Sequence, residues 1–277
     1  MIIELKNSGL PITMDKKTGK LFFNEQLNVK NSSTKILSQM KGLFKNDKFN
    51  DDDEPIYEVY RDIAFPNHKE IFLNNKIQYD ITVINEGLIG NERKKTSGHY
   101  HSWNEMRTFT YPEVYEVIHG TAIYILQRAD NFENPNYEHL HVEDIIVVKV
   151  EAGQSIIIPP NYGHCSVNGG EDILVFSNLA YTGCKVDYNP VKYYHGLGVY
   201  VVENEGKINF EVNENYYNLP KIKFATVKEN KELGIEFNKP IYKTFVNEPE
   251  KFDFLRNVDP YVNEIMNMLD MKEEIIL

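Results

Sequence analysis

Three histidines and one glutamate occur on segments that read as β-strands, and any fold of this chain has to accommodate them. His99 and His101 are two residues apart, so both imidazoles point to the same face of a strand. Glu113 opens an apolar, β-branched segment where an acid is unexpected, and His164 follows a strand that ends in Pro159-Pro160. Imidazole nitrogen and carboxylate oxygen together suit a first-row divalent ion. The sequence therefore predicts that strands bring these four side chains together as metal ligands, with positions left on the ion for water or substrate.

Strand-like segments separated by turn signals extend through most of the first 180 residues. After a hairpin over 11–23 with its turn at 17–20, we expect strands at about 56–61, 78–85, 97–103, 114–127, 145–150, 154–158, 165–167 and 173–180. This many short strands favour a sandwich or a closed barrel, because closure removes exposed sheet edges. A helix capped by Ser33 or Thr34 is predicted to pack one apolar face over the sheet. That face consists of Ile36, Leu37, Met40, Leu43 and Phe44.

The pattern changes after Val212. Residues 213–220 read as a polar, tyrosine-rich linker, 222–245 as short strand-like pieces, and 253–255 and 260–271 as helical. We therefore expect a domain over residues 1–212, with its core barrel at about 55–200. Residues 213–277 are predicted to form a C-terminal extension that serves packing or oligomerisation.

Composition and charge exclude several classes of partner. The net charge is −11 with no basic block, which argues against nucleic acid because phosphate backbones require clustered Lys and Arg. No stretch approaches the roughly 20 apolar residues of a membrane span, and the N-terminus does not resemble a signal peptide. Two cysteines in 277 residues make a disulfide framework improbable. We expect a cytoplasmic protein, and we read the acidic stretch over 46–54 as a solvated loop without function.

A second His-x-His pair, His139 and His141, competes with the first for a metal. It lies in a polar insertion over 128–144 that offers no carboxylate at a strand start. Solvated loop histidines are the better interpretation of this pair.

Several motifs resemble the cupin-type glucose-6-phosphate isomerases, a metal-dependent family, over roughly residues 10 to 212. The matching segments are Pro55-Ile-Tyr-Glu-Val-Tyr60, Asp80-Ile-Thr-Val83, Thr96-Ser-Gly-His-Tyr-His101, Pro112-Glu-Val-Tyr115, Pro159-Pro-Asn-Tyr-Gly-His164 and Asp187-Tyr188. The resemblance implies an all-β cupin fold, a double-stranded β-helix or jelly-roll barrel. An N-terminal hairpin and helix and a small α+β C-terminal extension would be added to it.

The function that this resemblance implies is the interconversion of glucose 6-phosphate and fructose 6-phosphate in glycolysis and gluconeogenesis. One divalent ion per subunit, Fe²⁺ ahead of Mn²⁺, Ni²⁺ or Zn²⁺, would be held by His99, His101, Glu113 and His164 in a cytoplasmic homodimer. Glu113 could double as the base if its carboxylate leaves the metal. An enediol route and a direct hydride shift both stay open.

The resemblance also assigns the remaining site residues. Those expected to bind substrate are Tyr57, Thr82, Thr96, Gly98 and Tyr188, and Tyr181 is expected to take part in catalysis. Tyr57, Thr82 and Thr96 would lie near the phosphate, and Gly98 would allow close approach of the backbone. One departure concerns Val186, which stands where the family pattern carries a histidine, in a segment one residue shorter. If that histidine moves a proton during ring opening, this chain must use another group or leave ring opening to solution.

Three other readings remain in competition. The chain could be a mannose-6-phosphate isomerase or an Fe(II) dioxygenase on the same barrel, or a non-catalytic sugar-binding cupin. A dioxygenase has no need for the hydroxyl donors Tyr57, Thr82 and Thr96. A binding protein of this type would be expected to have lost metal ligands.

Overall fold

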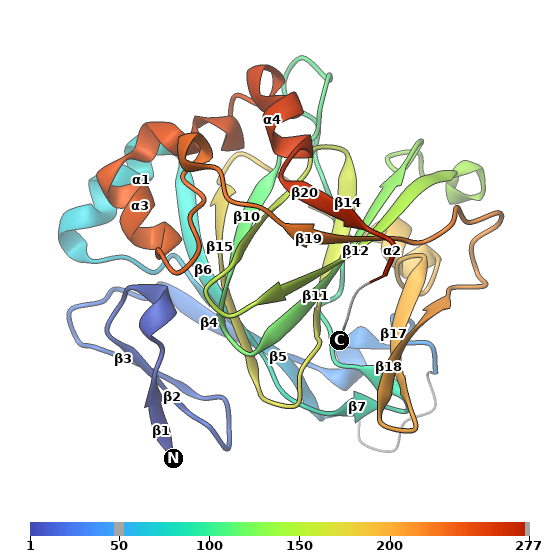
Figure 1. Ribbon diagram of the computed structural model, residues 1–277, viewed down its shortest axis with the longest axis horizontal. Helices are drawn as coiled ribbons and strands as arrows, with labels where there is room; N and C mark the ends of the chain where they lie inside the picture. Colours follow the sequence, from blue (N-terminus) through green and yellow to red (C-terminus); the bar gives the residue numbers. More distant parts are fainter. Residues whose placement is uncertain (47–52, 275–277) are drawn as a thin grey trace.

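The computed structural model describes residues 1–46 and 53–274 and consists mainly of β-strands (Figure 1). Most of the acidic stretch predicted as a loop over 46–54 lies outside these residues. One six-stranded sheet contains, in spatial order, β13 (Ser155–Ile158), β10 (Glu113–His119), β15 (Leu174–Tyr181), β6 (Ile77–Ile84), β5 (Pro55–Arg61) and β4 (Asn31–Ile36). A five-stranded sheet contains β14 (Tyr162–Asn168), β11 (Thr121–Ala129), β12 (Val142–Glu151), β19 (Lys223–Val227) and β20 (Leu269–Lys272).

The two sheets pack face to face around an apolar interior. Tyr115 and Phe176 of the six-stranded sheet share a buried cluster with Tyr124 and Leu126 of the five-stranded sheet. Side chains alternate along each strand, so Ile81 and other residues on the opposite faces belong to separate clusters outside the barrel. The all-β cupin barrel predicted from the sequence is confirmed.

Smaller elements cover the outer faces of the barrel. A three-stranded N-terminal sheet contains β1 (Ile2–Glu4), β2 (Ile12–Asp15) and β3 (Leu21–Phe23). A four-stranded sheet contains β18 (Lys207–Val212), β17 (Val199–Asn204), β8 (Glu92–Arg93) and β7 (Leu88–Ile89). The α-helices are α1 (Lys69–Asn75), α2 (Asn189–Tyr193), α3 (Ile241–Asn247) and α4 (Val262–Met266). None of the helices in the described part of the chain has the length and apolar character that a membrane span requires.

The predicted hairpin over 11–23 is confirmed by β2 and β3. The segment predicted as one strand over 114–127 is instead two strands, β10 and β11, joined at Gly120. Gly120 has φ +82°, and a Cβ atom there would lie 2.9 Å from the carbonyl oxygen of Ile173. Only glycine adopts this turn without strain, so the chain reverses at this position.

The predicted helix beginning at Ser33 or Thr34 is wrong. Residues Asn31–Ile36 form β4, which pairs with β5, and only the short 3₁₀ helix Leu37–Met40 follows. The apolar residues Leu37, Met40, Leu43 and Phe44 are nevertheless buried. Their spacing indicated burial correctly, but the backbone hydrogen bonds of β4 are satisfied by the neighbouring strand and not within a helix.

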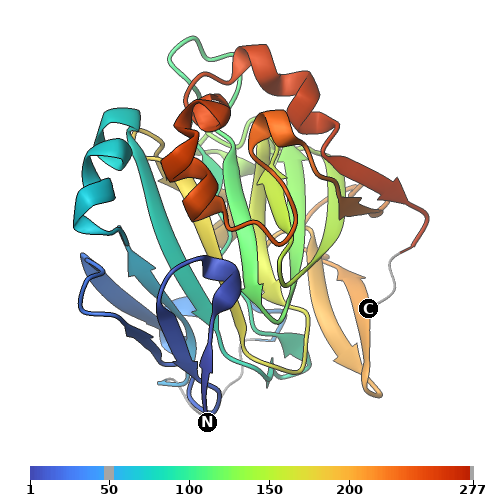
Figure 2. The same ribbon diagram turned by 60° about the vertical axis from the view of Figure 1, so that its left-hand side comes forward.

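The C-terminal residues add to the barrel and also cover it. β19 pairs with β12 in parallel and β20 pairs with β19, and Figure 2 shows the C-terminal helices lying across the outside of the barrel. The prediction of strand-like structure over 222–245 is wrong at α3, and the helix predicted over 260–271 ends at Met266. The division into a domain over 1–212 and an extension over 213–277 stays a prediction.

Residues after 212 complete one of the apolar clusters, and this contact can be tested through stability. Phe245 is fully buried, with ring centroids 4.8 Å from Phe72 and 5.7 Å from Phe252. Phe245→Ala should lower the free energy of unfolding by about 3–5 kcal/mol, because the lost ring leaves a cavity. Denaturant unfolding measures this, with Tyr217→Ala as control, since Tyr217 is 86% exposed. Equal midpoints for the two variants would contradict the packing described.

Candidate metal centre

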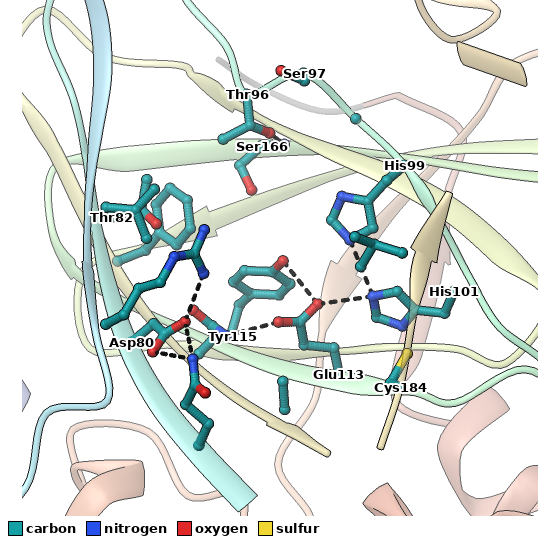
Figure 3. Close-up of a pocket in the computed structure, with 18 of the residues that line it drawn as sticks. Asp80, Thr82, Thr96, Ser97, His99, His101, Glu113, Tyr115, Ser166 and Cys184 are labelled. Carbon is teal, nitrogen blue, oxygen red and sulfur yellow. Dashed lines mark hydrogen bonds and ion pairs between the residues drawn. The ribbon is translucent and has the colours of Figure 1, made fainter. Parts of the chain in front are cut away.

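The four predicted ligands converge at one place inside the barrel. His99 precedes β9 (Tyr100–His101), which carries His101, while Glu113 begins β10 and His164 lies on β14. One potential ligand atom from each of the four lies within 4.8 Å of the others. Figure 3 shows the imidazoles of His99 and His101 beside the carboxylate of Glu113. The four side chains lie together as predicted. The strand expected over 97–103 is only the short β9, however, and His99 is joined to His164 by an isolated bridge outside it.

Backbone pairing places two of the histidines opposite each other. The His99 N–H donates to the carbonyl oxygen of His164 at 3.1 Å, and the His164 N–H donates to that of His99 at 2.9 Å. Gly98 has φ +73°, and a Cβ atom there would lie 3.2 Å from Cβ of Cys165. The absence of a side chain at Gly98 therefore lets the two segments approach closely.

The potential ligand atoms face a common point. His99 Nε2 lies 3.0 Å from His101 Nε2, and Glu113 Oε2 lies 3.2 Å from His101 Nε2 and 3.4 Å from His164 Nε2. His101 Nδ1 lies 2.7 Å from the carbonyl oxygen of Tyr111. A carbonyl only accepts, so Nδ1 carries a proton and Nε2 is the nitrogen available to an ion.

Burial and neighbouring groups set the charge states of the ligands. Burial would raise the pKa of Glu113, but hydrogen bonds with His101 and His164 keep it below its ordinary value. Burial lowers the pKa values of His99 and His164. Burial acts in the same direction on His101, but hydrogen bonds with Cys184 and Glu113 raise its pKa above the ordinary value. The Asn178 amide donates to Glu113 Oε1 at 2.7 Å and the Tyr115 hydroxyl donates to Oε2 at 2.9 Å. Two imidazoles of lowered pKa, a third that metal binding would deprotonate and an oriented carboxylate fit a first-row divalent cation.

A cavity of about 290 Å³ lies against this cluster. Its lining includes the predicted residues Tyr57, Thr82, Thr96, Gly98, Tyr181 and Tyr188, together with His99, His101 and Glu113. His164 is 1% exposed and completes the metal cluster behind this lining. The structure thus brings all ten predicted site residues to one region, while their individual roles stay predictions.

The hydroxyl groups at one end of the cavity are fixed by contacts within the protein. The Tyr57 hydroxyl lies 3.2 Å from Oγ of Ser97. The Ser166 N–H donates to Oγ1 of Thr96 at 3.0 Å, which ties the Thr96 segment to β14. Figure 3 shows Thr82 and Thr96 on opposite walls of the part of the cavity that lies away from Glu113. This end offers hydroxyl donors and the metal end offers ligands.

Sequence reasoning missed several polar residues of the same cavity. These are Arg61, Gln78, Asp80, Ser97, Tyr115, Ser166 and Asn178. Three of them could have been found, because residues two apart on a strand share a face. Arg61 lies four residues after Tyr57, Asp80 two before Thr82, and Tyr115 two after Glu113.

Val186 lines the cavity at the position where the resemblance led us to expect histidine. It lies on β16 (Val186–Asp187) and pairs with His101 of β9. Cys184 also lines the cavity, and Figure 3 shows it beside His101. The replacement of the family's histidine by Val186 therefore lies next to the metal cluster. Valine offers no group for proton transfer there.

The second His-x-His pair lies at the surface. His139 and His141 are both exposed. Within the described part of the chain, the residues grouped as possible ligands are the four above, and this pair is not among them. The reading of His139 and His141 as loop histidines is consistent with this placement.

Loss of one ligand should weaken metal binding without unfolding the barrel. His101→Ala removes one of the converging nitrogens, and we expect the affinity for Mn²⁺ or Zn²⁺ to fall at least tenfold. Loss of a group that only hydrogen-bonds to a ligand already costs roughly tenfold to a hundredfold in metal affinity. Elemental analysis after loading and dialysis measures retained metal. His139→Ala, from the exposed pair, is the matched control and should retain as much metal as wild type. Equal retention by both variants would refute the assignment of His101.

Comparison with known proteins agrees with this arrangement. The family model for glucose-6-phosphate isomerase matches residues 34–218. A glucose-6-phosphate isomerase of Thermococcus litoralis is 29% identical over 189 residues, covering 66% of this chain and 87% of the relative. One of Pyrococcus furiosus is 25% identical over 189 residues, covering 66% and 87%.

Similar solved structures include hazelnut vicilin, with a TM-score of 0.33 and 10% identity over 47% of this chain and 32% of that one. An oxalate oxidase structure has a TM-score of 0.25 and 14% identity over 38% of this chain and 41% of that one. The family assignment rests on the sequence match, which covers more than half of the chain. The chain belongs to the glucose-6-phosphate isomerase family.

Proposed function

We propose that this protein is a metal-dependent aldose–ketose isomerase that interconverts glucose 6-phosphate and fructose 6-phosphate. One observation carries the proposal: a four-residue metal cluster and a set of hydroxyl donors share one cavity. Membership of the family supplies the substrate class. A sugar phosphate matches a cavity with these two chemically different ends.

His99, His101, Glu113 and His164 would hold one divalent ion, and we propose Fe²⁺. Nitrogen and oxygen donors also accommodate Mn²⁺, Ni²⁺ and Zn²⁺. When bound, such an ion would polarise the sugar carbonyl and stabilise the negative charge that develops between C1 and C2. The histidines and the carboxylate would orient the reacting end of the sugar by fixing where that charge is favoured.

The phosphate would lie at the hydroxyl-lined end of the cavity. Tyr57, Thr82 and Thr96 offer O–H donors, and Gly98 lets backbone and ligand come close. Contacts at this end bind the ground state and the transition state alike, and they orient the sugar toward the metal cluster.

Tyr181 and Tyr188 are proposed to contact the sugar between these ends. Tyr188 has its ring centroid 5.4 Å from that of His99, and Tyr181 packs against Tyr111 at 4.9 Å. Tyr181 is proposed to take part in catalysis, since Val186 stands where the family pattern carries a histidine and offers no group for proton transfer. Opening of the sugar ring would then depend on Tyr181 or on solution.

We also propose that the enzyme acts in glycolysis and gluconeogenesis, in the cytoplasm and as a homodimer. Both substrates are intermediates of these routes. Residues 213–277 would serve packing or dimerisation, and their apolar side chains already contribute to a core shared with the barrel.

The competing readings account for less of the site. An Fe(II) dioxygenase gives no reason for the hydroxyl donors Tyr57, Thr82 and Thr96. A non-catalytic sugar-binding cupin gives no reason for a complete set of four ligands. A mannose-6-phosphate isomerase would use the same two ends, so this reading has to be separated by substrate.

An assay with chelated and metal-restored protein tests the proposal. Fructose 6-phosphate should yield glucose 6-phosphate in a coupled assay, the activity should vanish on chelation, and Fe²⁺, Mn²⁺, Ni²⁺ or Zn²⁺ should restore it. Mannose 6-phosphate and unphosphorylated fructose are the comparison substrates, both expected to react more slowly. Failure to form glucose 6-phosphate with any of the metals would contradict the proposal, as would equal rates with fructose.

We propose that Glu113 acts primarily as a metal ligand and not as the catalytic base. Its pKa is held below the ordinary value, so it is a weak base, and both of its oxygens accept hydrogen bonds from Asn178 and Tyr115. An efficient general base has a pKa near the working pH. The base role that the sequence also suggested would require the carboxylate to leave these partners.

Glu113→Gln separates the two roles because it removes charge and basicity at nearly constant shape. As a ligand variant it should bind metal more weakly, but turnover at saturating metal should recover to within about tenfold of wild type. A lost general base would instead cost roughly two to four decades at full metal occupancy. Glu116→Gln makes the same change on the same strand, where the side chain accepts from the Ile241 N–H outside the cavity. This control should keep both metal and turnover.

A further inference from the structure

Arg61 gives the cavity a positive charge that the proposed phosphate site does not yet use. It ends β5, where Tyr57, Val59 and Arg61 alternate toward the cavity. Among the described residues that line the cavity, Arg61 alone is a lysine or arginine. The chain carries a net charge of −11, so an anionic ligand gains little from the protein as a whole and depends on local donors.

Asp80 fixes the guanidinium at the cavity wall. Arg61 NH1 donates to Asp80 Oδ2 at 3.1 Å. Asp80 is buried at 4% exposure and also accepts from the Gln78 amide at 2.8 Å and from the Asp62 N–H at 2.8 Å. In Figure 3, dashed lines from neighbouring side chains converge on Asp80. The carboxylate is therefore well satisfied, and it orients the arginine without occupying all of its five N–H donors.

The remaining donors of Arg61 lie within reach of the hydroxyl-lined end. Val59 pairs directly with Thr82 across β5 and β6, so Arg61 is a diagonal neighbour of Thr82 on the same face. Diagonal neighbours are about 7–8 Å apart, within reach of a long side chain. Burial raises the pKa of Tyr57, and the charge of Arg61 opposes that rise. The Arg61 side chain is 45% exposed, so its head is open to a ligand.

A phosphate dianion in this cavity would face the carboxylates of Asp80 and Glu113. Hydroxyl groups donate hydrogen bonds but do not offset that repulsion, whereas a guanidinium does both and matches phosphate oxygens in a fork. We propose that Arg61 binds the phosphate group of the substrate together with Tyr57 and Thr82, and that Asp80 is the counter-ion that positions it. This inference rests on the proposed sugar-phosphate function and adds a residue that determines specificity for the phosphorylated sugar.

A purely structural role for Arg61 makes a different prediction. In that case the arginine only neutralises the buried Asp80 carboxylate. Removing Arg61 would then weaken phosphate binding through repulsion between Asp80 and the phosphate, and replacing Asp80 by asparagine as well would remove this repulsion. The variants Arg61→Gln and Arg61→Gln/Asp80→Asn therefore distinguish the two roles. Arg61→Lys keeps the charge but loses the fork and should lie between wild type and Arg61→Gln.

Two measurements test this. Calorimetry gives the affinity for inorganic phosphate, and steady-state kinetics gives KM and kcat for fructose 6-phosphate. Arg61→Gln should weaken phosphate binding and raise KM by about tenfold to a hundredfold, the usual effect of losing a charged hydrogen bond, with kcat changed less than about threefold. The double variant should stay as weak as the single one. Arg256→Gln is the matched control, since Arg256 also pairs with an aspartate, Asp253 at 2.8 Å, outside this cavity.

Unchanged phosphate binding in Arg61→Gln, or wild-type binding in the double variant, would overturn the proposal. A lower kcat with unchanged KM would do the same, because the residue would then act at the reacting end. If Arg61→Gln does not fold, the double variant and Arg61→Lys carry the same comparison. Phosphate binding is measured without turnover, so a wild type that binds phosphate through Arg61 but isomerises no sugar contradicts the proposed function and leaves the role of Arg61 standing.

Discussion

The paired backbone hydrogen bonds between His99 and His164 are the interaction on which the rest of the site depends. They join an otherwise irregular segment to β14 and set two imidazoles opposite each other. Before His99 along the chain, the same segment stays paired with β14: the Thr96 N–H donates to the Ser166 carbonyl oxygen and the Asn168 N–H to that of Lys94, both at 2.9 Å. The bridges His99–His164 and Lys95–Val167 differ in register by one residue, with Gly98 at φ +73° between them. This irregularity lets Thr96 and His99 both line the cavity although they are three residues apart.

Charge balance explains why so many polar groups are tolerated inside the barrel. Each buried carboxylate has its own partners: Asn178 and Tyr115 hold Glu113, and Gln78 and Arg61 hold Asp80. Unpartnered, either carboxylate would be costly to bury. These partners orient the two carboxylates, one toward the metal cluster and one toward an arginine. They keep the pKa of Glu113 low, whereas burial still raises the pKa of Asp80. The cavity is thus divided into an end suited to a cation and an end suited to an anion.

Most of the barrel and the metal cluster could be predicted from the sequence because both depend on a period of two. The spacing of His99 and His101 predicted that both imidazoles point to the same side, and glycines and prolines indicated where strands end. The helix expected at residues 33–44 failed for a physical reason. A short apolar cluster with helical spacing can equally be buried by an edge strand followed by a 3₁₀ turn, and the pairing of β4 with β5 satisfied the backbone first. The strand β20 at Leu269 was missed in the same way, since β19 was available to pair with it.

Arg61 and Asp80 could not be singled out by residue type, since an arginine and an aspartate on strands are ordinarily surface residues. The period of two places each of them on the face of a predicted site residue, but that Arg61 and Asp80 are neighbours follows only once the register between β5 and β6 is known. Val186 is the opposite case. The sequence alone showed that it replaces the histidine of the family pattern, but only the pairing of β16 with β9 shows that it lies beside His101. The local sequence pattern thus predicts which face of a strand a side chain occupies, whereas its neighbours on other strands follow only from the register.

The central claim is that the barrel holds a divalent ion among His99, His101, Glu113 and His164. Anomalous diffraction from crystals of the metal-loaded protein, recorded on both sides of the absorption edge of that metal, tests it most directly. The account predicts one peak per chain enclosed by these four side chains. A peak at His139 and His141, or none among the four side chains in fully loaded protein, would contradict it.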